Sequence, residues 1–96
     1  MQVNQIQNFI EKADPVEGHK TVVTFSNSTS YYGFFVRLID WEGLKAKNKW
    51  RFVPINKFAQ FDYEFRRNNN PNPDNSLIID GDSISKLEII KSYSLS

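Results

Sequence analysis

Basic and aromatic side chains gather in one short segment, residues 41–51 (WEGLKAKNKWR). Its cationic and aromatic members are Trp41, Lys45, Lys47, Lys49, Trp50 and Arg51. If the segment is extended, the four cations at every second position project from one face. Cations that follow phosphates, beside rings that stack on bases, are typical of single-strand nucleic-acid binding. The segment is therefore a candidate nucleic-acid or partner interface. The alternative is a solvated lysine-rich loop whose two tryptophans lie in the core.

Residues that support catalysis or bind metals are scarce. His19 is the single histidine and there is no cysteine, so a base-activated nucleophile and a zinc site both lack their usual residues. Asp80 and Asp82 flank Gly81, but the acidic spacing of an EF-hand calcium loop is absent, and a tight turn explains them more simply. We therefore predict that the protein is not an enzyme and that it binds no metal and no cofactor.

Length and composition favour one small domain, residues 1–96. Without disulfides, a domain of this size fits a reducing, cytoplasmic setting. We expect no targeting segment, and the apolar runs are too short to predict a membrane-spanning helix.

The net charge of +1 hides an asymmetry along the chain. Residues 41–57 contain five Lys and Arg against one Glu, whereas residues 71–96 contain four acidic residues against two Lys. The positive segment could therefore face an anion, or it could meet the negative segment of a neighbouring copy. A protein partner or self-association is thus expected, and nucleic acid is the other option.

Hydrophobic periodicity divides the chain into elements. Apolar residues at helical spacing predict an N-terminal helix within residues 1–15. Alternating β-branched and aromatic residues predict three strands within 20–55, the first two joined by a polar turn. A short helix and an Asn/Pro-rich loop form a predicted insertion over 56–75, and two short strands follow within 76–91. Five short strands can hide their edges by closing into a small antiparallel barrel.

Side chains on the predicted inner faces define the expected core. Its members are Phe25, Phe34 or Phe35, Ile79, Ile84 and Leu87. Within the insertion, Phe58, Phe61 and Phe65 recur at helical spacing and are expected to be buried as a lid. Gly33 is expected at a strand bend, and Gly81 at a turn with positive φ.

Two stretches resemble the Sm-like family (Sm, LSm and Hfq proteins), whose fold is an N-terminal helix followed by a five-stranded, strongly bent, SH3-like barrel. In VVTFSNSTSYYGFF, Gly33 falls eight residues after Phe25, as the family's bend glycine does after its alternating apolar residues. The better match is IIDGDSISKL, which reproduces the second motif's pattern of apolar-x-Gly-x-x-apolar-x-x-apolar at Ile79, Gly81, Ile84 and Leu87. The resemblance implies a mostly β fold with a helical insertion before the last two strands.

The residues of the family's RNA pocket are not retained. The family has an Asp-x-x-x-Asn arrangement in the first motif, but no Asn stands four residues after Asp40. Asp80 replaces the basic residue that precedes the second motif's glycine. An ionised carboxylate repels phosphate and cannot donate a hydrogen bond to a base. We therefore expect a divergent, non-enzymatic binding or assembly module, with RNA binding through residues 41–51 as the alternative.

Overall fold

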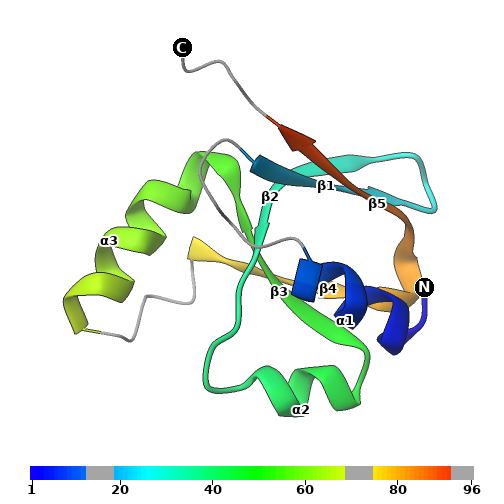
Figure 1. The fold of residues 1–96 in the computed structure, drawn as a ribbon, viewed down its shortest axis with the longest axis horizontal. Coiled ribbons are helices and arrows are strands. Elements are labelled where there is room, and N and C mark those ends of the chain that lie inside the picture. Colours follow the sequence, from blue (N-terminus) through cyan, green and yellow to red (C-terminus); the bar gives the residue numbers. More distant parts are fainter. Residues whose placement is uncertain (13–18, 69–74, 92–96) are drawn as a thin grey trace.

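Five antiparallel strands form one sheet in the computed structural model, which describes residues 1–12, 19–68 and 75–91 (Figure 1). The strands are β1 (His19–Phe25), β2 (Ser30–Phe35), β3 (Lys49–Pro54), β4 (Leu77–Asp80) and β5 (Ile84–Lys91). The helices are α1 (Val3–Lys12), α2 (Trp41–Ala46) and α3 (Phe58–Asn68), with 3₁₀ turns η1 (Ile55–Lys57) and η3 (Gly81–Ser83). The predicted helix, five strands and helical insertion are confirmed as elements. The expected Asn/Pro loop falls mostly on residues 69–74, outside the described residues.

The strands pair in the order β4-β3-β2-β1-β5. Towards the β5 edge, Val23 of β1 lies opposite Tyr31 of β2 and Leu87 of β5. β4 pairs with β3, where Trp50 lies opposite Ile79. The sheet is not closed, so β4 and β5 are its two edges. The fold is therefore a mixed α/β domain around an antiparallel sheet, and the pairing does not complete the expected barrel.

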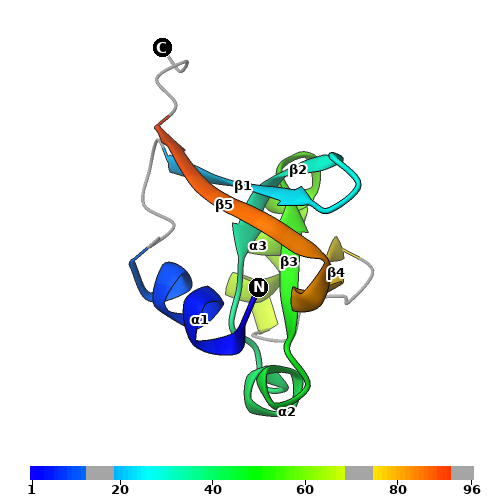
Figure 2. The ribbon, with the colours of Figure 1, turned by 90° about the vertical axis from the view of Figure 1, so that its right-hand side faces the viewer.

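The sheet is strongly bent. In Figure 2, β1 and β5 slope across the upper part of the molecule, whereas β3 stands nearly upright. The pairing of β1 with β5 shifts register between Thr24 and Phe25, and such an irregularity increases local twist and bending. The bend gives the sheet a concave side on which a helix can pack.

Helix α1 packs against the hydrophobic core of the domain through one apolar face. Ile6 and Ile10, one turn apart, are both buried, as the helical spacing predicts. Its first turn is closed by Gln5, whose side-chain oxygen accepts a hydrogen bond from the Gln2 backbone N–H at 2.9 Å. A ten-residue helix is marginal alone, so this burial stabilises it.

The core is built around aromatic residues of β2 and β3. Of the expected core residues, Phe35, Ile79 and Ile84 are buried, while Phe25 and Leu87 are partly buried against the same cluster. The largest fully buried side chains are Trp50 and Phe52. Burying rings of this size gives a small domain most of its hydrophobic stabilisation.

The phenylalanine stripe of α3 is buried in part. Phe61 is buried, and the half-buried Phe58 packs on Phe34 with ring centroids 4.4 Å apart. Phe65, at the far end of the stripe, is 38% exposed. The predicted lid is therefore anchored at its first turns, and its last aromatic residue faces a solvent-accessible pocket.

Candidate interaction surfaces

The basic-aromatic segment 41–51 spans two elements. Residues Trp41–Ala46 form α2, and β3 begins at Lys49. Lys47 lies at the C-terminal cap of α2, and Asn48 follows in the left-handed region with φ of 56°, a conformation that Asn tolerates better than most residues. Lys45 and Lys47 therefore do not lie on the strand that carries Lys49 and Arg51.

The two tryptophans pack against each other. Their rings meet edge to face with centroids 5.4 Å apart. Trp50 is fully buried, and its indole N–H donates to the Asn48 side-chain oxygen at 2.9 Å. Trp41 is half-buried, and the Arg37 guanidinium lies 4.7 Å above its ring. In this arrangement Trp50 has no free face for a base, and one face of Trp41 is covered by a cation.

Most cations of the segment have an acidic partner. Lys45 pairs with Glu42 at 3.1 Å, and Lys49 lies 3.9 Å from Asp80. The largely buried Arg51 guanidinium pairs with Asp40 and donates to the Ser76 hydroxyl at 2.8 Å. Among the described residues, Lys47 is the one lysine of segment 41–51 that forms no ion pair, and it is exposed.

Gly33 and Gly81 are required by close contacts. A Cβ at Gly33 would lie 2.1 Å from the Val53 carbonyl oxygen across the β2–β3 pairing. A Cβ at Gly81 would lie 2.2 Å from the Asn48 side-chain oxygen. Gly81 is buried and its φ is outside the positive region, so the expected positive φ is wrong. Its small size lets its N–H donate to the Asn48 carbonyl oxygen at 2.7 Å.

Asn48 is a structural residue that sequence reasoning missed. Besides its bonds to Trp50 and Gly81, its side-chain amide donates to Asp82 at 3.1 Å and to the Met1 carbonyl oxygen at 3.0 Å. These contacts tie the start of β3 to the β4–β5 turn. The only signal in the sequence is a single Asn after a short helical segment, where an αL residue commonly ends a helix.

The two sheet edges carry exposed apolar side chains. On β4, Leu77 is 39% exposed and Ile78 is 48% exposed; on β5, Ile89 is 41% exposed and Ile90 is 40% exposed. Each edge also presents backbone N–H and C=O groups with no neighbouring strand among the described residues. An apolar edge of this kind readily pairs with another chain. Sequence reasoning missed this surface because it expected a closed barrel.

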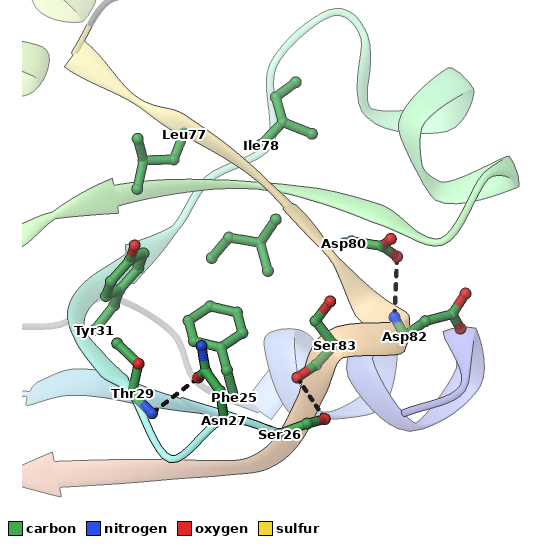
Figure 3. Close-up of a pocket in the computed structure, with 11 residues that line it drawn as sticks. Phe25, Ser26, Asn27, Thr29, Tyr31, Leu77, Ile78, Asp80, Asp82 and Ser83 are labelled. Carbon is green, nitrogen blue, oxygen red and sulfur yellow. Dashed lines mark hydrogen bonds between the residues drawn. The ribbon is translucent and has the colours of Figure 1, made fainter.

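A hollow of about 680 Å³ lies beside β4, here called the β4 hollow. Figure 3 shows that the β1–β2 turn forms one side and β4 the other, with Phe25 and Tyr31 facing Leu77 across it. The turn is braced by Asn27, whose side-chain oxygen accepts from the Thr29 N–H at 3.0 Å. Asp80 and Asp82 line the end of the hollow near η3. The β4 hollow thus has an apolar floor and an acidic end.

Within 1–12, 19–68 and 75–91, no three His, Cys, Asp or Glu side chains gather closely enough to hold a metal ion. No described helix is long and apolar enough to cross a membrane.

Comparison with known proteins gives no relationship for this chain: it matches no family model, no curated protein and no solved structure.

Proposed function

We propose that this protein is a non-enzymatic assembly module, with an Sm-like order of elements and an open sheet, that associates with further copies of itself through β4 and β5. One observation carries the proposal: both edges of the sheet are unpaired and apolar among the described residues. A strand from a second copy would satisfy the backbone groups of the edge and cover its exposed side chains. The order of elements, a helix and then five antiparallel strands, agrees with what the Sm-like resemblance implies.

Pairing of β4 with β5 of another copy also has a favourable register. With the strands antiparallel and Leu77 opposite Ile89, Asp80 falls opposite Lys86. Opposite charges facing each other across strands are stabilising, whereas like charges are destabilising. A shift of two residues that sets Leu77 opposite Lys91 would bring Asp80 against Glu88. The charge pattern therefore favours the first register over the second.

The β4 hollow supports the same partner. Its apolar floor lies beside the edge that would receive the strand, so an isoleucine of the incoming β5 can pack against it. Its acidic end includes Asp80, which falls opposite Lys86 of the incoming β5 in the first register. This interface is heterologous, because one surface binds a different surface on the next copy, and it produces rings or filaments.

A mixing experiment tests the proposal. Ile78→Lys places a charge on the β4 edge, and Ile90→Lys places one on the β5 edge, which is how natural edge strands are protected. Each variant alone should be monomeric. An equimolar mixture should form a heterodimer and nothing larger, because one intact β5 and one intact β4 remain. Association can be followed by analytical ultracentrifugation, with Ile39→Lys, at a fully exposed loop residue, as the matched control.

The outcomes separate the alternatives. If the Ile78→Lys variant still dimerises alone, the contact is β5 with β5, and the proposed heterologous pairing is wrong. If neither variant alters the mass of an associating wild type, the edges are not the interface. The competing RNA-binding function predicts that these edge substitutions leave the affinity for single-stranded RNA unchanged.

A further inference from the structure

A second pocket, of about 400 Å³, lies between α1, the segment after β2 and α3, and we call it the α1–α3 pocket. Its walls are apolar and mostly aromatic, and they include Ile10, Phe35, Leu38, Phe58, Phe61 and Phe65. The Phe61 and Phe65 rings are nearly parallel, at 11°, with centroids 6.2 Å apart. An aromatic pocket of this size is within the range that takes a small organic ligand.

Three charged residues line the α1–α3 pocket: Glu11, Arg37 and Asp62. Asp62 accepts a hydrogen bond from the Arg66 side chain at 2.9 Å. Glu11 accepts one from the Gln7 side-chain amide at 3.1 Å. Both carboxylates therefore already have a donor.

Arg37 differs from the two carboxylates. Its guanidinium is held over the Trp41 ring at 4.7 Å and lies 4.0 Å from the Glu11 carboxylate. It makes no hydrogen bond to any described residue. A guanidinium has five N–H donors in a planar fork that matches a carboxylate. Arg37 is thus a positioned cation with unused donors at the edge of an apolar pocket.

We infer that the α1–α3 pocket binds a small molecule with an apolar body and one carboxylate, the body lying among the phenylalanines and the carboxylate meeting Arg37. The contacts favour this class over an amine: Glu11 and Asp62 each accept a side-chain hydrogen bond, whereas Arg37 has only a long ion pair with Glu11, at 4.0 Å, and no hydrogen bond to a described residue. None of the pocket residues belongs to β4 or β5, so this inference goes beyond the proposed self-association.

Three ligands of equal chain length test the inference: octanoate, 1-octanol and octylammonium. Isothermal titration calorimetry on the full chain should give the lowest Kd for octanoate. Arg37→Gln should weaken octanoate by about fivefold, the factor that corresponds to roughly 1 kcal/mol for a partly exposed ion pair, and should leave 1-octanol unchanged. Arg67→Gln is the matched control. Arg67 lies on α3 but does not line the pocket, so this substitution should change the affinity for neither octanoate nor 1-octanol.

Two further variants keep the result specific. Glu11→Gln removes the carboxylate nearest Arg37 and should tighten octanoate binding. Phe65→Gln alters the most exposed phenylalanine of the wall, which stacks on the buried Phe61, and it should weaken all three ligands together. Intermolecular nuclear Overhauser effects should place the octanoate methylenes beside the Phe61 and Phe65 rings.

Several results would overturn the inference. Tighter binding of octylammonium would assign the polar contact to the carboxylates. Equal losses in Arg37→Gln and Arg67→Gln would show a general charge effect, and Overhauser contacts to β4 or β5 would place the ligand at the sheet edges. Absence of octanoate binding at millimolar concentration would also contradict the assigned site.

Discussion

Strand β3 and the two edge strands differ in how their groups are covered. Trp50, Phe52 and Val53 of β3 are completely buried, and the strand has hydrogen-bonded neighbours on both sides. β4 and β5 each have a neighbour on one side only and expose two large aliphatic side chains apiece. The interior strand is thus paired on both sides within one chain, whereas each edge strand is paired on one side only among the described residues.

That difference separates residues that fix the fold from residues available for association. Around β3, close contacts such as Gly33 against Val53 and Gly81 against Asn48 leave no room for a larger residue. At the edges, the four aliphatic side chains are each 39–48% exposed, so a larger part of their apolar surface stays in contact with solvent. We therefore expect substitutions at β3 to alter stability and substitutions at the edges to alter association.

The largest effect is expected at Trp50. Trp50→Ala should reduce the free energy of unfolding by about 3–5 kcal/mol, because it removes a fully buried ring and leaves a cavity. It also leaves the Asn48 side-chain oxygen without the indole donor. Urea denaturation followed by circular dichroism measures the loss. Trp41→Ala removes the half-buried ring of the same pair and should reduce the free energy of unfolding by less. An equal reduction would contradict the larger role assigned to the buried ring of β3.

A smaller loss is expected at Gly33. Gly33→Ala must push β2 away from β3, because the new methyl group would meet the Val53 carbonyl oxygen, and overpacking typically costs about 1–3 kcal/mol. Gly43→Ala is the matched control, since nothing lies within 4 Å of its Cβ position. In helix α2 this change should be neutral or stabilising by up to about 1 kcal/mol. The same denaturation experiment compares the two variants.

The edge substitution should have little effect on folding. For Ile78→Lys we expect a change within about 0.5 kcal/mol in the unfolding free energy, measured on monomeric protein, as for most surface substitutions. A loss comparable with that of Trp50→Ala would show that β4 contributes to the core through Ile78. The edge would then not be a free surface.

The smallest effect is expected at Lys47 in nucleic-acid binding. Lys47 is exposed and forms none of the ion pairs among the described residues. One lysine–phosphate contact contributes a slope near −0.7 to the plot of log binding constant against log salt concentration for a single strand. We expect oligonucleotides to bind no more tightly than about 10⁻⁴ M at physiological salt, the weak end of non-specific binding, and Lys47→Gln to change this little. Fluorescence anisotropy at several salt concentrations measures both. Tight binding that Trp41→Ala weakens by about 1–3 kcal/mol would favour the RNA-binding alternative.

Local pattern predicted much of the fold. The alternation in KTVVTFS and in SISKLEII placed β1 and β5 to within a residue or two, and the phenylalanine spacing located α3. These elements were found because their periodicity reflects which face is buried. The order of strands depends on contacts between distant residues, so the open edges could not be read from alternation alone.

The candidate site was harder to predict, and α2 shows why. The alternating lysines suggested an extended segment, but residues Trp41–Ala46 form a helix of six residues, too short for a clear hydrophobic period. Its lysine then pairs with Glu42 one turn away. Burial of Trp50 agrees with the alternative in which the tryptophans lie in the core, but segment 41–51 alone could not show which of its faces was the inner one.

Sedimentation equilibrium of the wild-type protein tests the central claim most directly. The chain has a mass of 11.2 kDa. If β5 of one copy pairs with β4 of the next, the average mass should rise above this value with protein concentration and level off at a multiple of it if a ring closes. The Ile78→Lys variant should stay at the mass of one chain. A wild type that remains at 11.2 kDa up to millimolar concentration would contradict assembly through the sheet edges.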